Sequence, residues 1–138
     1  MDQYTVSPYH GLPTDERVGV VGAGVGGSRP EWKLNLQLSA DWRWLGVGVA
    51  WRYIDAMQDA DAPNLGWDYR VPSEHYYDLF AESHFESGVL GGLTLRAGVE
   101  NLTNEQPPLI PSWVGANTDP SQYDVLGRRF YVNASLRL

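Results

Sequence analysis

The chain alternates between apolar and polar residues over several long stretches, and this alternation is its strongest structural signal. Between residues 32 and 42, apolar side chains take the even positions and polar side chains take the odd positions. Successive residues of a β-strand point to opposite faces, whereas a helix would bring apolar residues together at spacings of three and four. The pattern therefore predicts a strand with one apolar and one polar face. The same alternation recurs in residues 45–53, 77–86, 93–100 and 129–138.

Short and long connections alternate between these predicted strands. Residues 43–44 and 87–91 make tight connections, while residues 55–73 and 103–126 form long stretches rich in proline and polar residues. Residues 1–29 are rich in Gly and Pro without a sustained period, so we expect an irregular segment there. The fold class that we expect is all-β, an antiparallel meander of about five long strands.

Strand length and connection length together favour a membrane barrel. Transmembrane strands need about 9–11 residues, and such barrels join them through short turns on one side and longer loops on the other. A soluble sheet with one face on a core produces the same alternation, so the pattern alone leaves both architectures open. Aromatic residues favour the barrel, because they fall into two belts such as those at the two interfaces of a membrane. With the last strand running inward, the outer belt holds Trp32, Trp51, Tyr53, Tyr77 and Phe130, and the inner belt holds Trp42, Trp44 and Phe85.

Composition excludes several other classes of protein. The 138 residues carry a formal net charge of −7, from 10 basic and 17 acidic side chains, which does not suit a nucleic-acid-binding surface built on a basic stripe. Cysteine is absent, so there is no disulfide framework and no thiolate ligand or nucleophile. We accordingly expect no nucleic-acid partner.

Two short motifs suggest chemistry that their surroundings do not support. Gly22–Gly27 fits the G-x-G-x-x-G pattern of dinucleotide-binding loops, but Pro30 and the strand period that follows oppose the helix that such a site requires. Glu82, His84 and Glu86 share one strand face, yet alternate strand residues lie about 6.6 Å apart, too far for all three to hold one ion comfortably. No set of nucleophile, base and acid is apparent, so we expect neither an enzyme nor a cofactor or metal.

Several segments resemble the C-terminal strands of TonB-dependent outer-membrane receptors. Residues 96–108, Arg-Ala-Gly-Val-Glu-Asn-Leu-Thr-Asn-Glu-Gln-Pro-Pro, are similar to the penultimate strand of that family, and residues 117–132 are similar to its last loop and closing strand. Residues 30–35 and 49–54 are similar to the two strands that usually precede them. The motifs follow the family's order and spacing over about residues 30–138.

The resemblance implies a location in the bacterial outer membrane and a role in uptake. Residues 30–138 would be the last strands of a 22-stranded barrel, and the chain would be a fragment that lacks the plug domain and the TonB box. The whole receptor would import a scarce ligand, such as an iron chelate, a vitamin or a carbohydrate. Its partners would be outer-membrane lipid, the remainder of the barrel with its plug domain, the TonB–ExbB–ExbD system acting through the plug, and the barrel-assembly machinery. The chain departs from the family at Leu138, where an aromatic residue, most often Phe, is usual.

The alternation and the resemblance together assign strand side chains to the lumen or to lipid. The residues expected to face the lumen are Lys33, Asn35, Gln37, Asp41, Arg52, Asp78, Glu82, His84, Glu86, Arg96, Glu100, Arg129, Asn133 and Arg137. Those expected to face lipid are Leu34, Leu36, Leu38, Val47, Val49, Trp51, Leu79, Phe85, Leu93, Leu95, Val99, Phe130, Val132 and Leu136. The expected C-terminal signal for barrel closure consists of Phe130, Val132, Ala134, Leu136 and Leu138.

Further expectations concern one ion pair, the loops and an alternative function. Arg96 and Glu82 fall on neighbouring predicted strands, and we expect their charged groups to pair. The alternative function is a small soluble β-sheet ligand-binding protein that uses its polar face and long loops. Loops on a rigid scaffold often carry binding function, and the residues expected to contact a ligand there are Asp59, Asp61, Trp67, Tyr69 and Trp113.

Overall fold

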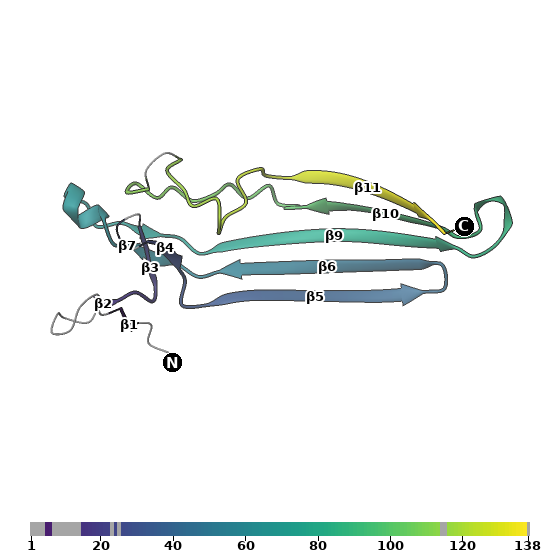
Figure 1. The fold of residues 1–138 in the computed structure, drawn as a ribbon, viewed down its shortest axis with the longest axis horizontal. Coiled ribbons are helices and arrows are strands. Elements are labelled where there is room, and N and C mark those ends of the chain that lie inside the picture. Colours follow the sequence, from purple (N-terminus) through teal and green to yellow (C-terminus); the bar gives the residue numbers. More distant parts are fainter. Residues whose placement is uncertain (1–4, 7–14, 23, 25, 114–115, 138) are drawn as a thin grey trace. The chain divides into compact units, whose positions relative to one another are not determined.

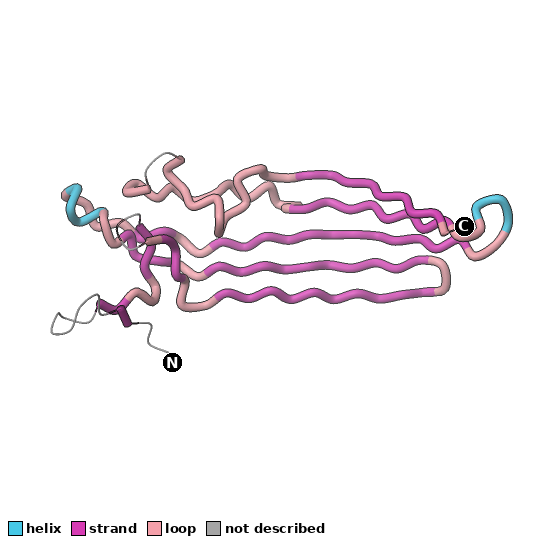
Figure 2. Tube along the Cα trace, viewed as in Figure 1, coloured by secondary structure: helices cyan, strands magenta, loops and turns pink. Residues whose placement is uncertain are grey.

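The computed structural model describes residues 5–6, 15–22, 24, 26–113 and 116–137, and it divides into two compact units. The first, which we call the small-sheet unit, contains the described parts of residues 1–33, 54–74 and 107–123. The second, the long-sheet unit, contains the described parts of residues 34–53, 75–106 and 124–138. Strands and loops make up most of the described chain (Figure 2), together with two 3₁₀ helices, η1 (Ala62–Leu65) and η2 (Gly88–Leu90). No helix in these ranges is long and apolar enough to cross a membrane.

Five long strands form one antiparallel meander, which confirms the expected all-β fold class. In the sheet they lie in the order β11-β10-β9-β6-β5 (Figure 1). The predicted bounds hold closely, although β9 begins at Glu74 rather than at Tyr77. The strands are β5 (Lys33–Trp42), β6 (Leu45–Ile54), β9 (Glu74–Phe85), β10 (Leu93–Glu100) and β11 (Arg129–Leu136). The expected closing residue Leu138 lies outside the described residues.

The strand register keeps residues of one kind on one face of the sheet. On β10, Ala97 lies opposite Ala81 of β9 and Val132 of β11, while the neighbouring Arg96 lies opposite Glu82 and Asn133. Because side chains alternate along each strand, a slip of one residue would exchange the two faces.

Gly92 fixes the connection between β9 and β10. Its φ is +84°, in the left-handed region, and its N–H donates to the carbonyl of Phe85 at 2.8 Å. A Cβ at Gly92 would lie 2.5 Å from the carbonyl oxygen of Arg137. Both its conformation and its close approach to the last strand therefore require glycine.

The small-sheet unit corrects the expectation of purely irregular structure in residues 1–29 and 55–73. Its four-stranded sheet has the order β4-β3-β7-β8, and β3 and β7 run parallel. Strands of two or three residues are too short for an alternating pattern to be read from the sequence. The strands are β3 (Val20–Gly22), β4 (Gly27–Arg29), β7 (Met57–Asp59) and β8 (Arg70–Val71), and β1 (Thr5–Val6) pairs separately with β2 (Asp15–Glu16).

A conventional core holds the small-sheet unit together. Around this sheet, apolar residues of both long connections are buried to 3% exposure or less. Burying such side chains is the main favourable contribution to folding. The buried apolar residues of this unit are Val21, Ile54, Met57, Ala62, Val71, Ile110 and Tyr123.

Asp59 joins the two long connections from within this core. It is fully buried, and its carboxylate accepts hydrogen bonds from the backbone N–H groups of Asp61 and Ala62, both at 3.1 Å. It also accepts from the backbone N–H of Ser112 at 3.2 Å and from the Ser112 hydroxyl at 2.5 Å. A buried carboxylate is tolerated where donors replace its lost hydration, so these bonds tie residues 55–73 to residues 107–123.

Replacing Asp59 should loosen this unit locally. We expect Asp59→Ala to lower the free energy of local opening by about 1–3 kcal/mol, because buried N–H groups lose their acceptor. Amide hydrogen exchange at Ala62 and Ser112 in the full chain measures this change. Asp68→Ala is the control, because exposed Asp68 accepts only a side-chain bond from Gln58 and its loss should cost less than about 0.5 kcal/mol. Equal exchange rates in both variants would contradict the role of Asp59.

Candidate functional site

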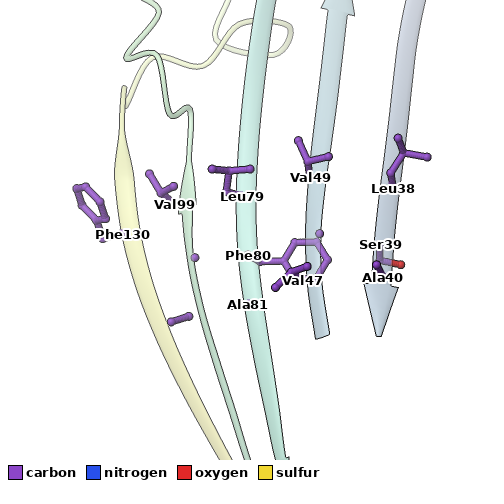
Figure 3. Close-up of a pocket in the computed structure, with 13 residues that line it drawn as sticks. Leu38, Ser39, Ala40, Val47, Val49, Leu79, Phe80, Ala81, Val99 and Phe130 are labelled. Carbon is purple, nitrogen blue, oxygen red and sulfur yellow. The ribbon is translucent and has the colours of Figure 1, made fainter. Parts of the chain in front are cut away.

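One face of the long sheet is apolar and exposed. Leu38, Val49, Leu79, Val99 and Phe130 form a row across all five strands, over a shallow hollow of about 730 Å³ (Figure 3). The residues expected to face lipid share this face, as the registers of β9, β10 and β11 and the alternation along β5 and β6 require. In this row, the exposed fraction is 79% for Phe130, 60% for Leu38, 40% for Leu79 and 36% for Val49, while Val99 is half-buried.

Within the long-sheet unit, no described segment packs over this face to form a second layer. Among its large apolar residues, those at least 36% exposed are Leu34, Leu36, Leu38, Val47, Val49, Leu79, Leu95, Phe130, Val132 and Leu136. Soluble monomers rarely leave so continuous an apolar patch in water. The face is therefore a surface that requires an apolar environment or a partner.

The opposite face carries cross-strand ion pairs. Arg96 and Glu82 lie directly opposite each other, with Nη1 of Arg96 3.7 Å from Oε2 of Glu82, which confirms the predicted pair. Nε2 of His84 lies 2.9 Å from the other carboxylate oxygen of Glu82. On β6, Nε of Arg52 lies 3.5 Å from Oδ2 of Asp78. These partly exposed pairs contribute modestly to stability, and they place basic groups beside acidic ones on this face.

The other residues expected to face the lumen lie at the margins of the paired region. Asn35, Gln37 and Asp41 are exposed on β5, and Asn133 is exposed on β11. Three more of the expected lumen-facing residues lie at or beyond the ends of strands. Lys33 donates to Oε1 of Gln122 in the small-sheet unit at 2.9 Å, while Glu86 and Arg137 lie just beyond the ends of β9 and β11.

Two aromatic residues on the polar face lie against glycines of neighbouring strands, a feature that the sequence analysis missed. Phe80 covers Gly48, and Tyr131 covers Gly98. A Cβ at Gly98 would lie 2.6 Å from Cζ and Oη of Tyr131 and 2.7 Å from the carbonyl oxygen of Leu79. In the sequence, Phe80 and Tyr131 each occupy a position on the polar face of a predicted strand. Only the pairing of the strands shows that a glycine lies beside each aromatic ring.

Asp124 is the centre of a hydrogen-bond network where the last long connection meets β11. Its side chain is 5% exposed, and Oδ1 accepts from Nη1 of Arg129 at 2.8 Å and from the backbone N–H of Leu126 at 3.0 Å. Arg129 also donates through Nε and Nη2 to Glu100 at 3.0 and 2.8 Å. The Asp124 N–H donates to the hydroxyl of Tyr76 at 3.4 Å. The network therefore links β9, β10, β11 and the connection that precedes β11.

The pKa of the Asp124 carboxyl lies below its ordinary value. Burial raises this pKa, but the hydrogen bonds from Arg129 and the Leu126 backbone, with the charges of Arg129 and Arg52, outweigh burial. A carboxyl with a lowered folded-state pKa contributes stability above its ordinary pKa, about 4, and loses that contribution as pH falls through the lowered value. The network is thus expected to weaken only in strong acid.

The loop residues expected to contact a ligand do not form one site. Asp59 is wholly buried in the small-sheet unit and satisfied by internal donors, which removes it from the exposed candidates. Asp61 accepts the backbone N–H of Gly24 at 2.7 Å. Trp67 is 58% exposed, and Tyr69 and Trp113 are partly exposed. Sequence alone could not separate the acidic residues that organise this unit from those available to solvent.

Neither of the two chemical motifs forms a site in the described residues. Gly27 begins strand β4 rather than a helix, and residues 23 and 25 of that motif lie outside the described residues. In the part of the chain that the structure describes, no group of three or more histidine and acidic side chains could hold a metal ion. Glu82 and His84 instead contact each other.

A matched pair of glycine substitutions tests the contact between Gly98 and Tyr131. Gly98→Ala should lower the free energy of unfolding by about 1–3 kcal/mol, because its methyl group meets the Leu79 carbonyl and the Tyr131 ring. Gly46→Ala comes closer than 3 Å only to the carboxylate end of the exposed Asp41 side chain, which can shift, and should cost much less. Urea unfolding of the full chain in detergent micelles measures both values, and a Gly46→Ala cost equal to that of Gly98→Ala would contradict the contact.

Removing Arg129 tests the cause of the low Asp124 pKa. Arg129→Met should raise the pKa of Asp124 relative to the unmodified chain, so the stability contribution of this carboxyl is lost at a higher pH. A titration of ¹³C-labelled aspartate carboxyls by NMR follows the change. Arg137→Met, at an exposed arginine outside the network, should leave this pKa unchanged. An unchanged Asp124 pKa in Arg129→Met would refute the assignment.

Comparison with known proteins identifies no relative of this chain. No protein-family model, no curated protein and no solved structure matches the sequence. The functional argument rests on the residues and the geometry described above.

Proposed function

We propose that this chain forms the C-terminal part of the barrel wall of a TonB-dependent outer-membrane receptor. One observation carries the proposal: five long strands expose a continuous apolar face, while the opposite face is polar and paired in charge. In a transmembrane barrel, an apolar outer face meets lipid and a polar inner face lines the lumen. The row from Leu38 to Phe130 would then contact lipid, and the pairs around Glu82 would face the lumen.

The open edges of the sheet support a larger barrel. Strands β5 and β11 each have one neighbour in the sheet, so each leaves one row of backbone groups unpaired along its outer edge. Lipid offers no hydrogen bonds to such groups, and only a closed barrel satisfies them. In the proposed receptor, the remaining strands of a 22-stranded barrel pair with both edges, and the barrel-assembly machinery inserts the complete wall.

The connections support one orientation of this wall. Two short connections, at residues 43–44 and 86–92, alternate with two long ones, at residues 55–73 and 101–128. Barrels of this kind place short turns on the periplasmic side and long loops outside. The long connections, which supply the core of the small-sheet unit, are then extracellular.

The complete receptor, as proposed, imports a scarce ligand. The resemblance implies an iron chelate, a vitamin or a carbohydrate as the ligand class, and a plug domain through which the TonB–ExbB–ExbD system supplies energy. The part formed by this chain contributes a section of wall and two outer loops. A soluble ligand-binding sheet, the alternative function, would need a further layer over the apolar face.

Site-directed spin labelling tests which face meets lipid, and the absence of native cysteine makes each label unique. Single cysteines replace Val132, Asn133, Ala134 and Ser135 in the full chain, reconstituted in phosphatidylcholine vesicles. We expect labels at 132 and 134 to be accessible to oxygen, and labels at 133 and 135 to a water-soluble nickel chelate, because successive side chains face opposite environments.

The exposed Asp68 provides the control for this measurement. A label at Asp68→Cys should be accessible to the nickel chelate whether or not the long strands enter the bilayer. Equal exposure of positions 132 to 135 to the chelate would show that both sheet faces lie in water, and it would overturn the proposed function.

A further inference from the structure

A second hollow lies on the polar face, between β10 and β11. It has a volume of about 530 Å³, within the range of small-molecule sites. All of its lining residues belong to the long-sheet unit. They are Arg96, Glu100, Arg129, Phe130, Tyr131 and Asn133.

The hollow offers polar groups of both kinds that are available to a ligand. Within the described residues, the Tyr131 hydroxyl and the Asn133 amide have no hydrogen-bond partner. Glu100 is 43% exposed, and its contacts with Arg129 use only Oε2, which leaves Oε1 as an acceptor. Arg96 is 40% exposed and lies 3.7 Å from Glu82, beyond hydrogen-bond distance. Donors and acceptors are therefore mixed around one concave surface.

An aromatic platform lies among these polar groups. The phenol end of Tyr131 lies beside Gly98, and the partly exposed Tyr131 is one of the residues that line the hollow. Arg96 is held beside it, with Cζ 4.1 Å from the centroid of the Phe80 ring. A flat ring flanked by donors and acceptors suits a ligand that has an apolar face and a polar rim.

The charges around the hollow argue against an ionic ligand. Two guanidinium groups, from Arg96 and Arg129, contact three carboxylates, from Glu82, Glu100 and Asp124. No surplus of positive charge is available to attract an anionic chelate. The excess is a single negative charge, and every one of these carboxylates already contacts an arginine, so the attraction for a cationic ligand is weak.

We propose that this hollow is a binding subsite for a carbohydrate, with a sugar ring stacked on Tyr131. A sugar ring has an apolar C–H face that packs on an aromatic ring. Its hydroxyls can donate to the Glu100 carboxylate, accept from the Arg96 guanidinium, and do either with the Asn133 amide. This inference rests on the proposed function, and it selects carbohydrate among the three ligand classes. The polar face of the long sheet forms one side of this proposed carbohydrate subsite.

Titration of the full chain with maltotriose tests the subsite. The chain is held in lauryldimethylamine oxide micelles, a detergent without a sugar headgroup, and binding is followed by saturation-transfer NMR, with citrate as the anionic comparison. We expect maltotriose to bind and citrate not to bind. Tyr131→Ala should weaken maltotriose binding about tenfold, and Tyr131→Phe, which keeps the ring, should change it less than about threefold.

The matched control is Asn35→Ala, on the polar face of β5 outside the hollow, which should leave maltotriose binding unchanged. Absence of maltotriose binding, binding of citrate in its place, or equal affinity in Tyr131→Ala would each overturn the subsite. The spin-label experiment distinguishes failure of the subsite from failure of the proposed function. Alternating accessibility without sugar binding overturns the subsite alone, whereas sugar binding without alternation supports the subsite and overturns the membrane wall.

Discussion

The exposed apolar face of the long sheet is the constraint on which the rest of the account depends. A sheet with one apolar face is stable only where that face is removed from water. The small-sheet unit has its own buried core, with Val21, Met57 and Ile110 fully inaccessible. Within the described residues of the long-sheet unit, no second layer covers the apolar face. Under the proposed function, lipid covers this face, and the strand length and the alternating connections are those of a transmembrane barrel.

The polar face shows how such a wall keeps its register without a core. Charge pairs such as that of Arg96 with Glu82 join neighbouring strands, but each is partly exposed and contributes little alone. The contacts of Phe80 with Gly48 and of Tyr131 with Gly98 make the fit between neighbouring strands specific to one register. A shift of register would separate each ring from its glycine. Tyr131 and Arg96 also line one hollow, so the proposed subsite uses residues that already have a structural role.

The sequence predicts the long sheet well because its signal is repeated over many residues. Alternation in residues 32–42 and in the four later segments gives strand positions and faces, and the Arg96–Glu82 pair follows from them. The small sheet is not predictable in this way, because strands such as β7 are only two or three residues long and are set by tertiary contacts. Burial of Asp59 also escapes prediction, since an acidic residue in a polar connection normally faces solvent.

The orientation of the strands in a bilayer tests the central claim most directly. Polarised infrared spectroscopy of the full chain in oriented bilayers reports the angle between the strands and the membrane normal. The account predicts that the chain enters the bilayer with its long strands tilted by about 35–45° from the normal, as in other transmembrane barrels. Strands lying in the membrane plane, or a chain that remains in the aqueous phase, would contradict the account.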